Sequence, residues 1–420
     1  PLLDGSIKHV PPPIVAEGPL QRQITSLDYS SFLGRIAVGK VGRGMITENQ
    51  PIALMQADGV IKRCRVKELY VFEGMGKKKV SEVHAGDLCA VVGIEDFNIG
   101  DTIADAENPE ALPRIAVDEP TMNMLFSINN SPFFGKDGKF VTSRHLRDRL
   151  MKEMEKNLAL RVVDTPEGDS FLVYGRGILH LGILIETMRR EGYELTVGQP
   201  QVIVKDIDGV KSEPYETLVV DVPEEFASKV IDLVSRKKGE MLVMETKGSM
   251  QHLEFDIPSR GLIGLRTQML TATTGEAVMA HRFREYKGWK GPIPGRNNGV
   301  LVSKFQERST GYSIDKLQDR GTFFIDAGEE VYAGQVVAEN IKPGDLVVNV
   351  TEAKKLTNHR ASGSDDATRI TPKTLMTLEE CMEYIQQDEC IEVTPNNIRM
   401  RKVTLNEDER KKEQKRMELA

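Results

Sequence analysis

One segment sets the architecture of this chain: Val173-Tyr-Gly-Arg-Gly-Ile-Leu-His-Leu-Gly-Ile-Leu-Ile-Glu-Thr-Met-Arg-Arg-Glu-Gly-Tyr-Glu-Leu195. Apolar residues recur in its middle at helical spacing, and two arginines occupy the expected last turn. Gly192 follows where a helix needs a left-handed cap. Extended residues stand on both sides of this helix. The segment therefore predicts a strand, a helix and a second strand.

The pattern extends outward from this segment and then recurs. Before it, residues 121–128 alternate as a strand, and residues 143–158 have the apolar face of a helix. After it, residues 216–222 alternate again and residues 223–236 predict a helix that starts with proline and acidic residues. Ser259 is expected to cap a second helix of this repeat. The chain therefore predicts two βαββαβ units in tandem.

Short strands dominate on either side of the repeat. Between 18 and 103 they are separated by glycine turns, which is typical of a closed β-barrel. We interpret Gly39, Gly42 and Gly44 as turn residues, because the Gly-x-x-x-x-Gly-Lys-Ser/Thr spacing of a phosphate loop is absent. Beyond a boundary rich in glycine and proline at 285–299, strand-like segments return. A second β-rich region is therefore expected there.

Length and composition exclude several classes of protein. A chain of 420 residues suffices for three or four domains, and it has no apolar run near the ~20 residues of a membrane helix. The formal net charge of −7 argues against a generally basic nucleic-acid binder but leaves room for local basic patches. The four cysteines, Cys64, Cys89, Cys381 and Cys390, lack zinc-ligand spacing and are expected to be reduced core residues. A cytoplasmic location is expected.

Particular motifs resemble known translation factors. Gly-Arg-Gly-Ile-Leu-His-Leu from Gly175, Met-Arg-Arg-Glu-Gly from Met188 and Gly-Gln-Pro-Gln-Val from Gly198 resemble the third domain of elongation factor G. His-Ala-Gly-Asp-Leu-Cys-Ala-Val-Val-Gly from His84 resembles the second-domain barrel of these factors. The region from Val350 to Ile370 resembles the C-terminal domain peculiar to the BipA (TypA) family, and the similarity covers essentially the whole chain.

The resemblance implies a multidomain fold of mixed β and α+β type, without the GTPase domain of the family. The second βαββαβ unit resembles the fifth domain of elongation factor G, with no counterpart of the fourth domain before it. The expected divisions are the end of the GTPase domain (1–13), a translation-factor β-barrel (14–112), a ferredoxin-like domain resembling the third domain (113–205), a ferredoxin-like domain resembling the fifth (206–286), and a BipA-specific β-rich domain with a terminal helix (287–420).

The resemblance also implies a function. The chain is expected to be the ribosome-binding portion of a BipA-like translational GTPase, which contacts rRNA and A-site tRNA and supports large-subunit assembly and adaptation to cold or other stress. It implies the large ribosomal subunit as the main partner, with the small subunit as well, no membrane, and a monomer. GTP and Mg²⁺ would bind the missing GTPase domain, so this chain alone is expected to hold no cofactor and to hydrolyse no GTP.

Other classes of function stay open at this point. The chain could be the corresponding part of another factor of the elongation factor G or LepA type. It could also be a protein-interaction scaffold, whose binding would depend little on salt, or an enzyme with an unrecognised site. His180 begins a helix without a neighbouring nucleophile or orienting carboxylate, so no catalytic residue and no metal site are expected.

Two basic clusters are candidate RNA contacts. Arg236, Lys237 and Lys238 end a predicted helix, where attraction to the helix dipole explains cations equally well. The second cluster combines cations with Tyr286 and Trp289, as single-stranded nucleic-acid sites do. Its candidate contacts are Arg282, Lys287 and Lys290. We favour the alternative in which the tryptophan anchors a domain interface.

A long polar loop from 353 to 370 supplies the third group of candidates. Cations and hydroxyl groups surround a Ser-Gly-Ser turn, and loops of this length in compact domains are usually functional or disordered. Its candidate RNA contacts are Lys354, Lys355, Asn358, His359, Arg360, Ser362, Ser364 and Arg369. The resemblance implies that this loop approaches the peptidyl-transferase region and the acceptor end of A-site tRNA.

Overall fold

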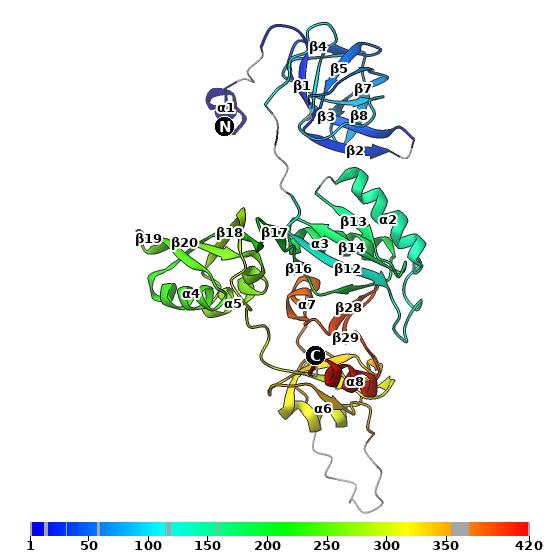
Figure 1. Ribbon diagram of the computed structural model, residues 1–420, viewed down its shortest axis with the longest axis vertical. Coiled ribbons are helices and arrows are strands. Elements are labelled where there is room, and N and C mark those ends of the chain that lie inside the picture. The colour runs from blue at the N-terminus through cyan, green and yellow to red at the C-terminus, as the bar shows by residue number, and fades with distance from the viewer. Residues whose placement is uncertain are drawn as a thin grey trace, which may run out of the picture. The chain divides into compact units, whose positions relative to one another are not determined.

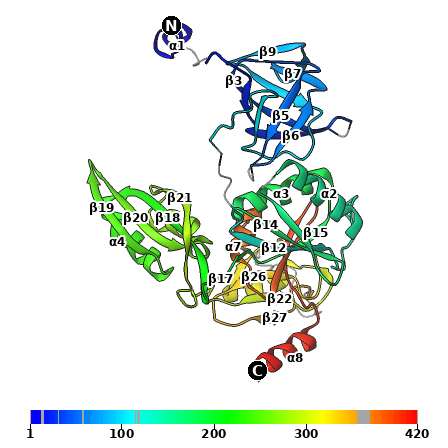
Figure 2. The ribbon, with the colours of Figure 1, turned by 45° about the horizontal axis from the view of Figure 1, so that its top comes forward.

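The computed structural model describes residues 2–418 except 12–15, 31, 57–58, 114, 116–118, 158 and 354–368 (Figures 1 and 2). The chain forms two compact units. The first comprises Pro1–Glu119 and Arg149–Arg161, and the second comprises Pro120–Asp148 and Val162–Ala420. Among the described residues, no helix has both the length and the apolar character needed to cross a membrane.

A large antiparallel sheet makes up most of the first unit. Its strands have the order β6-β5-β11-β1-β3-β10-β7-β8, and β2 also pairs with β3. The elements are α1 (Leu2–His9), β1 (Gln21–Gln23), β2 (Ser26–Ser30), β3 (Gly34–Arg43), β4 (Met45–Thr47), β5 (Pro51–Met55), β6 (Ile61–Arg65), β7 (Glu68–Glu73), β8 (Gly76–Lys79), β9 (Glu82–His84), β10 (Leu88–Val92) and β11 (Thr102–Asp105). Strands β4 and β9 form a separate pair.

One hydrophobic core is shared by both arms of this sheet. It includes Ile52 of β5 and Leu69 of β7. The closed barrel expected from the sequence is nevertheless wrong, because no backbone pairing between described residues joins edge strand β6 to edge strand β8. The C-terminal end of β3 pairs with β1, and the earlier residues of β3 pair with β2 and β10. The two arms therefore meet at β3, and side-chain packing rather than a continuous ladder encloses the core.

The glycines of β3 have a different role from the one expected. Gly39 and Gly42 lie within the strand, and only Gly44 has a positive φ, of 73°. A Cβ atom on Gly39 would lie 2.0 Å from the carbonyl oxygen of Gln23. Gly39 is therefore required by the close approach of two backbones and not by a turn.

Both predicted βαββαβ patterns are present with the expected order of elements, and they belong to the second unit except for residues 149–161. The first pattern forms a sheet with the order β13-β14-β12-β15-β28-β29, and β16 also pairs with β12. Its elements are β12 (Met122–Ile128), α2 (Ser143–Lys156), β13 (Arg161–Asp164), β14 (Ser170–Gly175), α3 (Ile178–Glu191), β15 (Leu195–Gly198), β16 (Gln201–Val202), β28 (Glu389–Val393) and β29 (Ile398–Lys402). Gly192 ends α3 with a φ of 96°, which confirms the predicted left-handed cap.

The C-terminal strands β28 and β29 extend this sheet (Figure 1). Strand β28 pairs antiparallel with β15, and Val197 lies opposite Ile391. Helix α7 (Leu378–Tyr384) packs on α3, where a Cβ atom on Gly182 would lie 3.0 Å from Cε of Met382. The expected domain boundaries stay a prediction, and residues from the expected C-terminal domain complete the sheet of the first βαββαβ pattern.

The second pattern forms a sheet with the order β17-β18-β20-β19, and β21 pairs with β18. Its elements are β17 (Lys205–Ile207), β18 (Val210–Pro223), α4 (Glu224–Arg236), β19 (Glu240–Lys247), β20 (Met250–Pro258), α5 (Leu265–Ala272) and β21 (Val278–Gly288). The helices cover one face (Figure 2), where Val230 and Leu265 join the core around Leu218. The helix expected to start at Ser259 begins later, because a 3₁₀ turn comes first and Gly264 has a φ of 71°.

Polar side chains occupy the other face of this sheet. His252 of β20 lies between two carboxylates, with Nδ1 2.7 Å from Oδ1 of Asp221 and Nε2 3.3 Å from Oε1 of Glu254. These hydrogen bonds, that to Asp221 first, raise the pKa of His252 above its ordinary value of 6.5. The charged imidazole is therefore favoured in the folded state.

The free energy of unfolding should fall as the pH rises from about 6.5 through the raised pKa of His252, because the folded chain keeps a proton that the unfolded chain releases. The contribution is complete below that range and lost above it. Urea unfolding at a series of pH values would measure this slope, which His252→Gln should reduce. An unchanged slope in His252→Gln would contradict the assignment.

A smaller β-rich region follows, as the sequence predicts. Its main sheet has the order β24-β26-β22-β27, with β22 and β27 parallel. The elements are β22 (Val300–Ser303), β23 (Glu307–Arg308), α6 (Gly311–Leu317), η2 (Gln318–Arg320), β24 (Gly321–Phe323), β25 (Glu330–Val331), β26 (Val336–Asn340), β27 (Leu346–Val348) and the terminal helix α8 (Glu407–Glu418). Leu301, Val337 and Val350 lie in its core.

A buried ion network connects this region to the β28–β29 hairpin. The ammonium of Lys402 contacts Asp345, Asp388 and Glu389 at 2.5, 2.6 and 3.0 Å. Arg296 binds the same Glu389 carboxylate through two hydrogen bonds of 2.9 and 3.2 Å. Because Lys402 and Glu389 are almost fully buried, each depends on the other for its charge to be tolerated.

Candidate nucleic-acid interface

The first predicted basic cluster, Arg236, Lys237 and Lys238, ends helix α4. Arg236 forms an ion pair with Asp232 one turn earlier, with Nη2 2.7 Å from Oδ2. Lys237 is half-buried, and desolvation lowers the pKa of its ammonium group. Lys238 is exposed where the chain leaves the helix. Two of the three cations are therefore partly engaged by the fold itself.

The second cluster lies along and after β21, and it comprises Arg282, Lys287 and Lys290. Lys287 pairs with the buried carboxylate of Asp256, and Lys290 pairs with Glu240. The ammonium of Lys290 also lies 3.3 Å from the carbonyl oxygen of Lys238, so the structure brings the two predicted clusters together. The Arg282 side chain is exposed, and its guanidinium makes no hydrogen bond or ion pair with the part of the chain that the structure describes.

The tryptophan beside this cluster is held by cations of the protein. The guanidinium of Arg260 lies 3.8 Å from the ring centroid of Trp289, and the ammonium of Lys211 lies 4.4 Å from it. Arg260 in turn forms an ion pair with the fully buried Glu213. This geometry favours the anchoring alternative over an open stacking surface.

A cleft of about 570 Å³ lies beside the first cluster. It is lined by Lys237, Arg260 and Trp289, and on another side by Arg296. Both arginines are paired with buried carboxylates. Their charge is therefore largely balanced, and the cleft lacks the excess of cations that a phosphate site requires.

Most of the third group of candidates lies outside the described residues. Lys354, Lys355, Asn358, His359, Arg360, Ser362 and Ser364 belong to the range 354–368. Arg369 is described and exposed, and its carbonyl oxygen accepts a hydrogen bond of 3.1 Å from Nε2 of Gln318.

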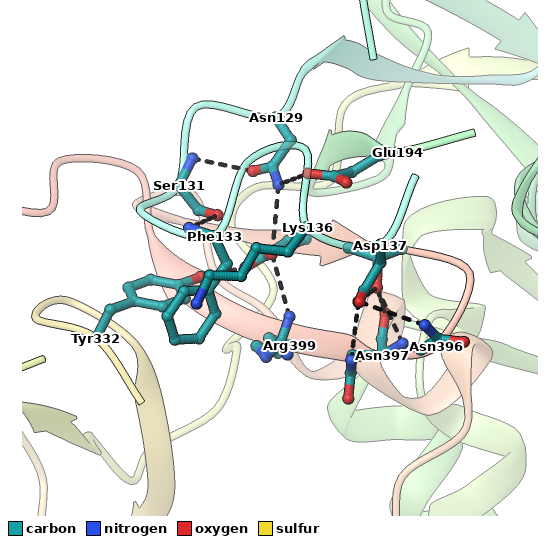
Figure 3. Close-up of polar contacts among 12 residues, drawn as sticks. Asn129, Ser131, Phe133, Lys136, Asp137, Glu194, Tyr332, Asn396, Asn397 and Arg399 are labelled. Atoms are coloured by element: carbon teal, nitrogen blue, oxygen red, sulfur yellow. Dashed lines mark hydrogen bonds and ion pairs between the residues drawn. The ribbon is translucent and has the colours of Figure 1, made fainter. Parts of the chain in front are cut away.

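The sequence analysis did not single out residues 129–142, here called the 129–142 loop. The loop combines three phenylalanines, two glycines and two lysines in the sequence Asn-Asn-Ser-Pro-Phe-Phe-Gly-Lys-Asp-Gly-Lys-Phe-Val-Thr. That combination is the signal that could have identified it. The structure shows that the loop is fixed by polar side chains from several distant elements (Figure 3).

Glu194 immediately precedes β15 and holds the first half of the loop through hydrogen bonds. Its carboxylate accepts hydrogen bonds from Nδ2 of Asn129 at 2.6 Å and from the backbone N–H groups of Gly135 and Gly138 at 2.9 and 3.0 Å. Asn129 also donates to Oε1 of Glu392 at 3.3 Å. One amide therefore connects the loop to Glu194 beside β15 and to Glu392 in the neighbouring strand β28.

Glu392 gathers further donors on the buried side of the loop. Tyr332 donates from its hydroxyl at 2.5 Å and Arg399 from Nη1 at 3.2 Å. Burial, with the charge of Glu392 second, raises the pKa of Tyr332 well above its ordinary value, so the hydroxyl keeps its proton. The ring of Phe133 packs edge-on against Tyr332 at 5.1 Å, and the ammonium of Lys136 lies 3.9 Å from the Phe133 centroid.

Asp137 fixes the middle of the loop to the turn between β28 and β29. It accepts hydrogen bonds from Oγ1 of Thr394 at 2.8 Å and from Nδ2 of Asn397 and Asn396 at 2.9 and 3.3 Å (Figure 3). Burial opposes the charged form, but these hydrogen bonds lower the pKa of Asp137 in total. The carboxylate is therefore charged at neutral pH and able to hold all three donors.

His180 and the four cysteines have defined positions among the described residues. His180 accepts a hydrogen bond of 3.2 Å from the backbone N–H of Arg176 at the start of α3, which fits the helix-terminus interpretation. No group of three or more His, Cys, Asp or Glu side chains in the described ranges could hold a metal ion. Cys89, Cys381 and Cys390 are buried, as expected for core residues, and Cys64 is partly buried.

Three segments match sequence models of protein families. Residues 34–104 match "Elongation factor Tu domain 2", residues 210–296 match "Elongation factor G C-terminus", and residues 298–407 match "TypA/BipA C-terminal domain". The last match includes β28 and β29, which join the sheet of the first βαββαβ pattern.

Relatives described as "Large ribosomal subunit assembly factor BipA" match nearly all of the chain. The relative from Bacillus subtilis (strain 168) is 45% identical over 422 residues, which cover 100% of this chain and 69% of the relative. The relative from Synechocystis is 46% identical over 405 residues, with 96% and 68% covered. The relative from Escherichia coli (strain K12) is 44% identical over 415 residues, with 98% and 68% covered.

Proposed function

Because this chain belongs to the BipA family, we propose that it is the ribosome-binding portion of a BipA-type factor and takes part in assembly of the large ribosomal subunit. The observation that carries the proposal is the identity of about 45% along the whole chain to relatives named as large-subunit assembly factors. The match of residues 298–407 to the BipA C-terminal domain favours this family over elongation factor G or LepA.

The contacts with RNA form the finer part of the proposal. Exposed cations at Lys238 and Arg282 would meet rRNA phosphates, and the region 353–370 would meet the acceptor end of A-site tRNA. Lys287 and Lys290 are already paired with carboxylates, so they would contribute less. The large subunit would be the main partner, with further contacts to the small subunit, and the protein would act as a cytoplasmic monomer that supports adaptation to cold or other stress.

The enzymatic part of the family's activity would lie outside this chain. The three matched segments correspond to non-GTPase domains, and the chain spans about two thirds of the length of its relatives. We therefore propose that GTP and Mg²⁺ bind to a GTPase domain in the parent protein and that this chain alone does not hydrolyse GTP.

Co-sedimentation with purified ribosomal subunits at two salt concentrations tests the proposal. The chain should sediment with the large subunit at low salt and be released as the salt rises, because each phosphate contact displaces counterions. Replacement of residues 353–370 by a short Gly/Ser link should weaken binding to the large subunit at both salt concentrations. A link of the same length that replaces the exposed turn 74–75 between β7 and β8 of the first unit is the matched control.

Two outcomes would count against the proposal. Failure to bind at low salt, both for this chain and for the same chain joined to a BipA GTPase domain, would remove the ribosome assignment. Binding that survives nuclease treatment and changes little with salt would instead support the protein-interaction scaffold.

A further inference from the structure

We propose that the 129–142 loop is a contact site for single-stranded RNA, in which Phe140 stacks on a base and Lys139 and Arg144 hold the flanking phosphates. The inference deepens the proposed function and rests on it for the source of the RNA, which would be an unpaired segment of rRNA. The site differs from the basic clusters and the 353–370 region that the sequence suggested.

The loop is fixed along its length. Glu194 binds two of its backbone N–H groups, and Asp137 binds three side chains of the β28–β29 turn. At its far end, Phe140 donates its N–H to the carbonyl oxygen of Gly192 at 3.2 Å and accepts the N–H of Glu194 at 3.1 Å. The backbone of the loop is therefore held in its first half, in its middle and at its far end.

Fixing the loop in this way is energetically expensive. Glu194 and Glu392 are 3% and 0% exposed, and removing a carboxylate from water costs several kcal/mol before its hydrogen bonds are counted. Neither side chain contributes apolar surface to a core. A loop that a scaffold holds with buried charges while its own side chains face solvent is typical of a binding site.

The side chains that the loop exposes are aromatic and cationic. Phe134 is 48% exposed and Phe140 is 36% exposed. The ammonium of Lys139 is exposed and makes no hydrogen bond or ion pair within the described ranges. Lys136 is also exposed but pairs with Glu330 at 3.3 Å. Aromatic rings at the surface beside free cations offer faces on which a partner can stack.

The structure also brings a second cation–aromatic pair to the same place. The Phe140 ring packs on Tyr193 at 4.7 Å and against His145 at 5.3 Å. His145 follows Arg144 in the first turn of α2, and the Arg144 side chain is 89% exposed with only a 3.9 Å contact to Asp148. The rings of Phe140 and His145 are therefore in contact. The preceding cations, Lys139 and Arg144, both face solvent.

This combination selects single-stranded RNA among the ligands of a ribosome-binding protein. A base stacked on an aromatic ring contributes binding energy whatever its sequence, and adjacent cations follow the backbone. Duplex RNA keeps its base faces stacked inside the helix and could use only the cations. An exposed aromatic surface without free cations would be expected at a contact with protein.

The test compares two variants of this chain with matched controls. Phe140→Leu keeps the apolar volume but removes the stacking face, and Lys139→Ala with Arg144→Ala removes the two cations. The controls are Phe32→Leu and Lys415→Ala, at exposed positions in the first unit and in α8. Affinity is measured by fluorescence anisotropy with a labelled 12-nucleotide RNA of random sequence, with a 12-base-pair RNA duplex, and by co-sedimentation with large ribosomal subunits.

Phe140→Leu should weaken binding to the single strand by about tenfold and to the duplex by much less. The double alanine variant should reduce the slope of log K against log [salt] by about 1.4 for the single strand, as expected for two lost phosphate contacts. Circular dichroism of each variant checks that the fold is retained, and both variants should bind the large subunit more weakly than the controls.

Three results would separate this inference from the proposed function. If the wild-type chain binds the large subunit and both variants bind it equally well, the inference is wrong and the function stands. If the variants lose subunit binding but keep single-strand affinity, the loop meets ribosomal protein and the RNA assignment is overturned. If the chain never binds ribosomes but the variants lose single-strand affinity as expected, the site stands and the proposed function fails.

Discussion

A chain that ends at Met376 should lose the folded state of the first βαββαβ pattern as well as its own C-terminal elements. The truncation removes α7, β28 and β29, and leaves β15 as an open edge of the sheet. The apolar side chains that it removes from buried positions are Leu378, Met382, Ile385, Ile391, Val393 and Met400. At about 1.5–3 kcal/mol each, their burial amounts to roughly 9–18 kcal/mol, which matches the whole stability of a typical domain.

Hydrogen exchange of the backbone amides would measure this effect. In the intact chain, the amides of β12 and β15 should exchange only through global unfolding. In the truncated chain, they should exchange at close to the rate of an unfolded peptide. A chain that ends at Leu405 is the control, because it removes only the charged and exposed helix α8. Protection that persists in β15 after truncation at Met376 would show that the first sheet is stable without β28.

Glu389→Ala should lower the free energy of unfolding of the second unit by about 3–5 kcal/mol, because it leaves the buried charges of Lys402 and Arg296 without their shared partner. Asp345 and Asp388 still contact Lys402, so Arg296 is the side chain that loses most. The single tryptophan, Trp289, lies in the same unit and can report urea unfolding by fluorescence.

Two further variants define the cause of this loss. Glu389→Gln keeps the shape and one acceptor oxygen but loses the charge and replaces the other acceptor with a donor, so its loss of stability should be smaller than that of alanine yet clearly measurable. Glu409→Ala, at an exposed position in α8, should change the free energy of unfolding by less than about 0.5 kcal/mol. A loss below 1 kcal/mol for Glu389→Ala would mean that water replaces the carboxylate and that the network is not dry.

The order of helices and strands could be predicted from the sequence because it depends on local patterns. Apolar spacing and a glycine cap suffice to define α3, and the structure places Gly192 in the predicted left-handed conformation. The expected terminal helix is likewise present, and α8 begins after Asn406, which accepts the N–H of Asp408 at 2.9 Å. Local signals failed where a neighbouring residue changes the backbone, as Gly264 does before α5.

The pairing of β15 with β28 could not be predicted in this way. Glu389 and Glu392 lie in a short strand together with apolar residues. Two carboxylates in so short a strand predict that it is half-exposed. They are buried because Arg296, Lys402, Arg399 and Asn129 reach them from elsewhere in the unit. No pattern within the strand records those partners.

The candidate RNA contacts show the same limit. The sequence reveals that Lys287 and Lys290 are cations, but their pairing with Asp256 and Glu240 depends on the register of β21. Conversely, Lys139 is one lysine among many in the sequence, and only the fold leaves it exposed beside an aromatic cluster. Charge can therefore be read from a sequence, whereas its availability to a phosphate cannot.

The late position of β28 in the chain has a consequence for the order of events during synthesis. A ribosome makes β15 about 190 residues before β28, which at 5–20 residues per second corresponds to roughly 10–40 s. During that interval the backbone of β15 stands without its final neighbour, and open strand edges of this kind invite pairing with other chains. The emergence of β28 from the exit tunnel therefore sets the moment at which this edge of β15 is covered.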